Sequence, residues 1–227
     1  MCARYVFYSG IRAIADDFGA VPLPNMEPEF NLAPTDVVAG IVVREGSKVA
    51  MPFRWGLVPS WADNPSIGQK LINARSETAA EKPSFRGAMR YRRCILPADG
   101  FYEWKGPKGA KQPYYIYRAD GKPMAFAGLW ETWEKEGYLE TCTILTTAAN
   151  AEMSTIHDRM PVILEPGEYE RWLNPEATNS ADVLDLLDPA IDGTLTMHPV
   201  GKAVGNPRAS GPELIASVAA PNLFGDF

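Results

Sequence analysis

A succession of strand-like runs fills the middle of this 227-residue sequence and limits the folds that it can adopt. The runs are rich in β-branched and aromatic residues and are bounded by segments with Gly, Pro, Asp or Asn, which is typical of β-strands. Residues 119–122 and 134–137 are predicted to be hairpin turns, and the basic segment 106–111 a hairpin loop. The strand-like runs cover residues 36–44, 50–58, 92–104, 112–119, 124–133 and 138–148.

Helical patterns are fewer and lie mainly towards the two ends of the chain. They cover residues 11–18, 83–91, 151–157, 168–173 and 180–187. This arrangement predicts an α+β fold, with one domain over residues 1–227 built on a curved, mostly antiparallel β-sheet or barrel with peripheral helices. Residues 213–227 are expected to form a loosely held tail.

Composition excludes several classes of protein. No stretch approaches the ~20 apolar residues of a membrane helix, and acidic Asp16 and Asp17 stand where the apolar part of a signal peptide would continue. We therefore expect a cytoplasmic protein without a membrane partner. Nothing in the sequence indicates an assembly larger than a monomer.

The cysteines argue against a disulfide framework and against a metal site. Only Cys2, Cys94 and Cys142 are present, without a CxxC pair. With only two histidines besides, we expect no structural metal and no cofactor. Cys94 and Cys142 lie in strand-like runs, so both are expected to be buried and unreactive.

Charge is distributed unevenly along the chain. The net charge is −6, but residues 70–118 carry eleven Lys and Arg against four Asp and Glu. This basic block could form a phosphate-binding groove on an otherwise acidic protein. A solvated charged surface would give the same composition.

Cys2 directly follows the initiator methionine. If Met1 is removed, the new N-terminus carries an amine and a thiol on adjacent carbons. The amine can condense with an aldehyde, and the thiol can then close a stable five-membered thiazolidine ring. The thiol could instead attack a carbonyl, as in an N-terminal-nucleophile hydrolase, and a cysteine can also follow methionine by chance.

Two central motifs carry polar residues suited to catalysis. In LINARSET (71–78), Asn73, Arg75 and Glu77 alternate, so they share one face of an extended segment. Asn both donates and accepts hydrogen bonds, and Arg binds phosphate with two N–H groups. Glu103, flanked by Tyr102 and Trp104, suits a general acid or base, although a surface Glu beside core aromatics fits equally well.

HDRMP (157–161) places His157 two residues before Arg159 at the end of a predicted helix. His157 could protonate a sugar ring oxygen while Arg159 holds a phosphate. A serine triad of Ser154, His157 and Asp158 lacks the GxSxG turn that would support it. In RWGLVPSW (54–61), Trp55 is expected in the core, while Trp61 could stack on an unpaired base.

These motifs occur together in a characteristic order. With MCxR at the start, NxAP at 31–34 and HPVGKAVGNPR at 198–208, the sequence resembles the SOS response-associated peptidase (SRAP) family over residues 2–208. The resemblance implies a single α+β domain that binds an abasic site in single-stranded DNA, or at a junction of single- and double-stranded DNA. DNA binding would associate the protein with the nucleoid. The family usually begins MCGR, whereas Ala3 replaces the glycine here.

The resemblance also implies roles for particular residues. Cys2 would form a thiazolidine crosslink with the abasic-site aldehyde, Asn73 would position it, Glu103 would act as acid or base, and His157 would promote sugar ring opening. Arg4, Arg75 and Arg159 would bind flanking phosphates, while Pro34 and Trp61 would press against bases. The family name further implies an associated peptidase or lyase activity, with self-removal of whatever precedes the cysteine.

Two other functions stay open at this point. A cysteine peptidase with Cys2 and His157 as its dyad would cleave other proteins. A non-catalytic single-stranded DNA-binding module would bind abasic DNA equally well without Cys2.

Overall fold

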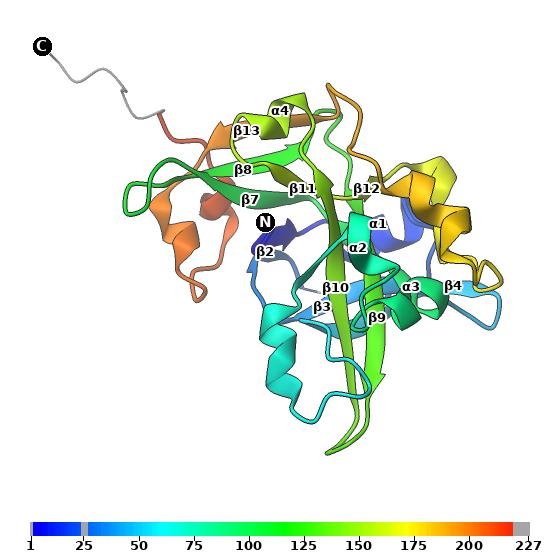
Figure 1. The fold of residues 1–227 in the computed structure, drawn as a ribbon. Coiled ribbons are helices and arrows are strands. Elements are labelled where there is room, and N and C mark those ends of the chain that lie inside the picture. Colours follow the sequence, from blue (N-terminus) through cyan, green and yellow to red (C-terminus); the bar gives the residue numbers. More distant parts are fainter. Residues whose placement is uncertain (1, 24–26, 220–227) are drawn as a thin grey trace, which may run out of the picture.

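Two β-sheets form the centre of the fold, with short helices around them (Figure 1). The computed structural model describes residues 2–23 and 27–219. The first sheet has the strand order β13-β8-β7-β1-β2 and is antiparallel throughout. Its strands are β1 (Tyr5–Phe7), β2 (Glu29–Leu32), β7 (Gly100–Lys105), β8 (Gln112–Arg118) and β13 (Leu195–Pro199).

The second sheet closes on itself. Its order is β11-β10-β4-β3-β6-β9-β12, and β9 also pairs with β10, so five strands form a ring; β5 adds to β10. β10 pairs in parallel with β4 and β5, and the other strand pairs of this sheet in the described residues are antiparallel. The strands are β3 (Val37–Arg44), β4 (Ser47–Trp55), β5 (Asn73–Arg75), β6 (Arg93–Ala98), β9 (Met124–Trp133), β10 (Leu139–Ala148), β11 (Arg159–Pro161) and β12 (Ile163–Leu164). The predicted α+β fold with a mostly antiparallel barrel is confirmed.

Short helices cover the sheets, and none in the described ranges is long and apolar enough to cross a membrane. The α-helices are α1 (Gly10–Asp16), α2 (Ser76–Ala79), α3 (Arg86–Tyr91), α4 (Ala151–Ser154) and α5 (Tyr169–Leu173). The 3₁₀ helices are η1 (Pro65–Lys70), η2 (Pro166–Glu168), η3 (Ser180–Leu187), η4 (Lys202–Gly205) and η5 (Pro212–Ile215).

The core between the sheets explains why the strand runs are so apolar. Nearly every residue of β9 is buried, since the ring packs against other elements on both faces. Tyr5 of β1 packs its ring edge against Trp55 and Phe126, with centroids 5.4 and 5.9 Å apart. Cys94 and Cys142 are buried in this core, as predicted. The N-terminal strand is therefore fixed to the barrel by aromatic packing.

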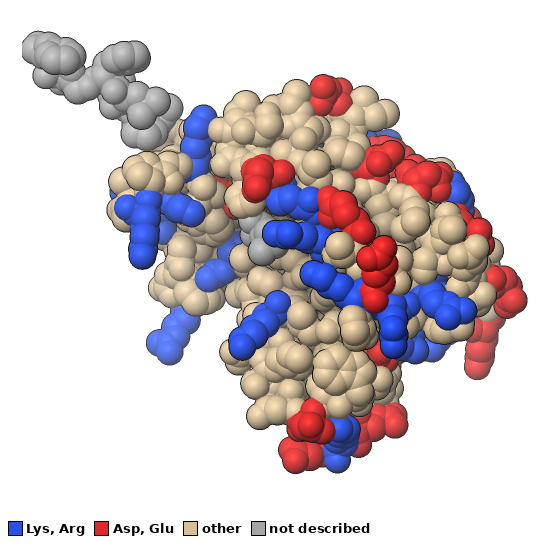
Figure 2. Space-filling view, viewed as in Figure 1, with Lys and Arg blue, Asp and Glu red and all other residues tan. Residues whose placement is uncertain are grey.

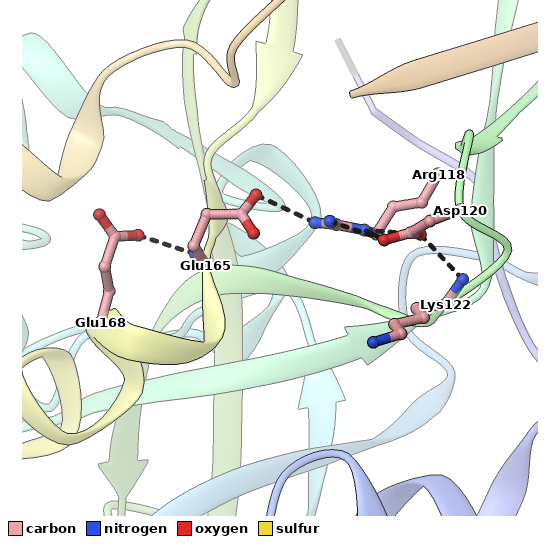
Figure 3. A network of polar contacts seen from close by, with 5 residues as sticks. All are labelled: Arg118, Asp120, Lys122, Glu165 and Glu168. Atoms are coloured by element: carbon pink, nitrogen blue, oxygen red, sulfur yellow. Dashed lines mark hydrogen bonds and ion pairs between the residues drawn. The ribbon is translucent and has the colours of Figure 1, made fainter. Parts of the chain in front are cut away.

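The turn at residues 119–122 is not a hairpin, contrary to the prediction. It connects β8 in the first sheet to β9 in the second. The Arg118 guanidinium binds Asp120 in the turn and Glu165 before η2, at 3.0 Å each (Figure 3). Because β8 and β9 belong to different sheets, the chain crosses from one sheet to the other at this turn. A local turn sequence specifies the reversal of the chain but not which strands pair.

The predicted hairpins at 106–111 and 134–137 are confirmed, since β7 pairs with β8 and β9 with β10.

The helix predicted for residues 180–187 is present as a 3₁₀ helix. One further expectation is corrected. The tail is not loosely held over residues 213–218, because Leu214 is buried against Val200 and Val204, and the amide of Val218 donates to Pro199. Residues 220–227 of the predicted tail lie outside the described residues.

Asp99 anchors the start of α1 to the corner between β6 and β7. Its carboxylate accepts hydrogen bonds from the amides of Tyr8 and Ser9, at 2.6 and 2.8 Å, and from the Ser9 hydroxyl at 2.5 Å. These bonds satisfy backbone donors at the helix start that would otherwise lack partners. Burial raises the pKa of Asp99 above its ordinary value, outweighing the hydrogen bonds that lower it.

This raised pKa gives a pH-dependent contribution to stability. The contribution of Asp99 is fully present below the unfolded-state pKa of about 3.9 and decreases as the pH rises through the folded-state value. The unfolding free energy of wild type minus that of Asp99→Asn should therefore be larger near pH ~4 than at pH ~7 in urea titrations. Asp188→Asn, at an exposed position, is the control. A difference that shrinks at the lower pH would contradict the assignment.

Candidate active site

Cys2 lies two residues before Arg4 and three before the first residue of β1, at the edge where the two sheets meet. The side chain is only 1% exposed, and its Sγ lies 3.8 Å from the carbonyl oxygen of Arg4. The Asn73 side chain donates from Nδ2 to the backbone carbonyl of Cys2 at 2.7 Å. This contact joins the first described residue of the chain to the start of β5. Met1 lies outside the described residues, so its removal stays a prediction.

Glu103 stands next to Cys2 because of the register between β1 and β7. Tyr5 pairs with Phe101, and the Tyr102 amide donates to the carbonyl of Arg4. Since the strands are antiparallel, continuing this register brings Glu103 close to Cys2. Glu103 is buried. Burial raises the pKa of the Cys2 thiol well above its ordinary value, and the Glu103 charge raises it further. The sulfur is therefore a neutral thiol at neutral pH.

Strand β10 brings Asn73, Arg75 and Arg159 together. In the parallel pairing of β5 with β10, Asn73 lies opposite Ile144 and Arg75 opposite Thr146. β11 pairs antiparallel with the end of β10, where Arg159 lies opposite Ala148. Arg75 is exposed at the end of β5. Glu77, expected on the same extended face, instead lies in the first turn of α2 because the chain turns helical at Ser76.

Arg159 is held by protein groups on two sides. Its Nη atoms bind both carboxylate oxygens of Glu77, and Nη2 donates to the Thr146 carbonyl at 2.5 Å. Only 15% of the Arg159 side chain is exposed, whereas half of Glu77 is. The Arg159 guanidinium lowers the pKa of the Glu77 carboxyl. Arg159 thus ties β11 to α2 and β10, a function that the sequence did not indicate.

His157 follows α4 and is positioned by its neighbours. Its amide donates to the Met153 carbonyl at 2.8 Å, which continues the last turn of the helix. The ring Nδ1 lies 3.0 Å from the Arg159 amide and 2.9 Å from Asp158 Oδ1. A neutral ring accepts from the amide at Nδ1 and carries its proton on Nε2, whereas a protonated ring donates to Asp158.

Arg4 is oriented by Asn31, a buried residue to which the sequence gave no role. The Arg4 guanidinium donates to Asn31 Oδ1 at 3.0 Å, and Asn31 donates to the carbonyls of Asn206 and Ala209, at 2.9 Å each. Burial lowers the pKa of Arg4. Asn31 therefore links two distant motifs, NxAP and HPVGKAVGNPR. Because both acceptors are main-chain carbonyls, no side chain in the second motif could have indicated this contact.

Pro34 and Trp61 lie on loops. Pro34 is half-buried in the turn after β2, which is attached to β4 by the Thr35 amide and the Trp55 carbonyl. Trp61 is 54% exposed and lines a cavity of about 400 Å³. Trp55 is fully buried in the core, as predicted. The described hydrogen bonds of the other candidate site residues do not include Pro34 or Trp61.

Part of the basic block is committed to structure. The buried Arg93 donates to the carbonyls of Trp172 and Asn174, at 2.6 and 2.7 Å. Arg92 pairs with Glu131 at 2.7 Å. Lys and Arg nevertheless gather in a band that runs from the N end of the chain over α2 to α3 (Figure 2). Within the described ranges, no group of His, Cys, Asp and Glu could hold a metal ion.

Comparison with known proteins identifies the family. The family model for the SOS response associated peptidase (SRAP) matches residues 1–207. The chain belongs to the SRAP family. Among SRAP relatives, the abasic site processing protein YoqW of Bacillus subtilis is 42% identical over 224 residues, covering 96% of this chain and 100% of YoqW. The abasic site processing protein YoaM of the same organism is 40% identical, covering 95% of this chain and 97% of YoaM.

A solved structure agrees with this SRAP assignment. A protein from Bacteroides thetaiotaomicron has a TM-score of 0.86 at 26% identity, covering 96% of this chain and all of that one. The resemblance deduced from the motifs is therefore confirmed, both for the family and for the fold.

The role of Asn31 in this SRAP protein can be tested by substitution. Asn31→Ala leaves the Ala209 carbonyl without its donor, while the Asn206 carbonyl keeps the Ala209 amide and Arg4 keeps the Val204 carbonyl. The unfolding free energy should therefore fall by about 2 kcal/mol. Asn64→Ala removes only an exposed bond to the Ser66 amide and should cost about 1 kcal/mol or less. Equal losses in urea unfolding would show that Asn31 does not link the two motifs.

Proposed function

We propose that this protein processes abasic sites in single-stranded DNA by forming a covalent link through Cys2. The observation that carries the proposal is the contact between the Asn73 side chain and the Cys2 carbonyl, with Glu103 beside the thiol. This arrangement fixes the chain terminus against two polar side chains in a buried place. The names of the SRAP relatives YoqW and YoaM, abasic site processing proteins, support the choice of substrate.

The proposed reaction needs the free amine of Cys2. With Met1 removed, the amine adds to the aldehyde of the ring-opened sugar, and loss of one water gives a Schiff base. The thiol then adds to the same carbon, its proton passes to the nitrogen, and the thiazolidine ring closes. An α-amine with a pKa of about 7.7–8.0 is partly neutral at neutral pH, whereas the buried thiol keeps its proton. The amine therefore reacts first.

The surrounding residues take the proton-transfer and positioning roles. Asn73 Oδ1 is buried and has no hydrogen-bond partner in the described part of the chain, so it is available to accept from the freed amine. Glu103 carries a proton from the attacking amine to the departing hydroxyl group, and later carries the thiol proton to the ring nitrogen. His157 acts on the sugar ring oxygen. These roles require no metal or cofactor.

The arginines and the loop residues are proposed to hold the DNA around the lesion. Arg75 is exposed and binds phosphate directly, whereas Arg4 and Arg159 offer the N–H groups that Asn31 and Glu77 leave available. Pro34 and Trp61 contact the neighbouring bases. A preference for single-stranded or junction DNA and a monomeric state are parts of the same proposal.

Replacement of Cys2 tests the covalent step. Wild type should give a heat-stable adduct with an abasic oligonucleotide on a denaturing gel, and Cys2→Ser should give none. Cys142→Ala, at another buried cysteine, should crosslink like wild type. An adduct in Cys2→Ser would refute the assignment, and its absence in wild type lacking Met1 would favour simple DNA binding.

Replacement of Glu103 tests proton transfer. Glu103→Gln keeps the size of the side chain but cannot accept a proton, so adduct formation should slow by about 100-fold or more. Its pH dependence should also flatten, which a packing defect alone would not cause. Affinity for undamaged single-stranded DNA should stay within about twofold of wild type, which is a change of less than ~0.4 kcal/mol in the free energy of binding. An unchanged rate would remove Glu103 from the mechanism.

A further inference from the structure

A second basic face lies beside the candidate site, over α3 and the loop that carries Trp61. We define the α3 surface by Trp61, Lys82, Arg86, Arg90 and Tyr91. Lys82, Arg86 and Arg90 recur at intervals of four, and the Arg86 amide donates to the Lys82 carbonyl at 2.9 Å. Their side chains therefore share one side of a helical stretch. All three are exposed.

The cations of the α3 surface differ from those committed to structure. Within the part of the chain that the structure describes, no ion pair or hydrogen bond engages the side-chain nitrogens of Lys82 or Arg86. Arg92, in contrast, is neutralised by Glu131. The Arg90 guanidinium lies 5.0 Å from the centroid of the Tyr91 ring, which is 52% exposed. Positive charge and an aromatic ring are thus presented together.

A cavity joins Trp61 to this helix. It has a volume of about 400 Å³, and Trp61, Pro83, Arg86 and the Arg92–Glu131 pair line it. Trp61 leaves more than half of its surface exposed here, which is unusual for a large aromatic side chain. An exposed ring beside unpaired cations is the combination that binds single-stranded nucleic acid, because bases stack while phosphates pair.

The α3 surface is fixed to the candidate site by the chain itself. Residues 56–72 connect β4 to β5 and carry Trp61, and the Trp55 indole donates to the Ile72 carbonyl at 2.8 Å across the base of this loop. The Ala62 carbonyl accepts from the Trp133 indole at 2.7 Å. The helices α2 and α3 follow β5 directly. The band of Lys and Arg in Figure 2 runs from the N end over the same two helices.

We infer that the α3 surface binds the single strand where it continues from the abasic site, with a base stacked on Trp61 and phosphates on Lys82 and Arg86. This inference rests on the proposed function for the identity of its ligand. Unpaired bases are required, since a duplex hides the faces that stack. The surface would make affinity depend on the length of strand beside the lesion.

The double variant Lys82→Ala/Arg86→Ala tests the surface by fluorescence anisotropy. The ligands are undamaged single-stranded oligonucleotides lengthened one nucleotide at a time. Wild type should bind more tightly with length until the surface is covered, and the variant should lose this gain, about tenfold in affinity. The slope of log affinity against log salt should fall by about 1.4, or ~0.7 for each lost phosphate contact.

A matched control removes the same charge elsewhere. Arg12 and Lys122 are exposed and lie beyond the ends of β1 and β8 that point away from Cys2 and Glu103, as the strand registers show. Arg12→Ala/Lys122→Ala should bind like wild type at every length. Equal losses in both double variants, or no loss in Lys82→Ala/Arg86→Ala, would overturn the proposal.

Adduct formation with an abasic oligonucleotide, measured in parallel, separates this proposal from the proposed function. If wild type crosslinks and Lys82→Ala/Arg86→Ala binds undamaged strands like wild type, the proposed role of the α3 surface is wrong and the proposed covalent function stands. If no protein crosslinks but Lys82→Ala/Arg86→Ala loses its length-dependent affinity, the surface is supported and the covalent function fails. Unfolding midpoints should match for all variants, since only exposed cations are changed.

Discussion

The pairing of the first few residues with β7, completed by the bond from Asn73 to the Cys2 carbonyl, determines what this protein can do. Chain ends usually fray because few contacts hold them. Here the aromatic core holds Tyr5, and Asp99 binds the backbone where β1 becomes α1. These contacts hold residues 5–9 against the barrel. A reaction that uses the terminal amine needs the chain end to be held in place, because the amine and the thiol must both reach the same aldehyde carbon.

The electrostatics of the site follow from burial rather than from net charge. The Cys2 thiol is buried near a carboxylate, which disfavours the thiolate. In the proposed reaction the terminal amine is therefore the first nucleophile. The arginines around it are oriented by neutral or acidic partners, Arg4 by Asn31 and Arg159 by Glu77. Both guanidinium groups are held in fixed places, and the charge of Arg159 is offset by Glu77. In the proposed function, a DNA backbone would bind there without first ordering flexible side chains.

Much of this was predictable from the sequence, and the errors have physical causes. The strand runs, the hairpins at 106–111 and 134–137, and the burial of Trp55 follow from residue patterns that act locally. The partner of a strand depends on contacts across the whole chain, so the turn at 119–122 was misassigned. The partners of Glu77 and Asn31 lie on distant segments and were likewise missed. The basic block indicated a DNA-binding face but could not separate Arg93, which binds carbonyls in the core, from Arg86 at the surface.

The most direct measurement of the central claim is the intact mass of the protein and of its denatured adduct with an abasic oligonucleotide, with and without borohydride. The account predicts a protein without Met1, and an adduct that weighs one water less than the sum of protein and DNA. Borohydride should leave that mass unchanged, because a closed thiazolidine has no C=N bond to reduce. A gain of two hydrogens, an adduct that retains Met1, or no adduct at all would contradict it.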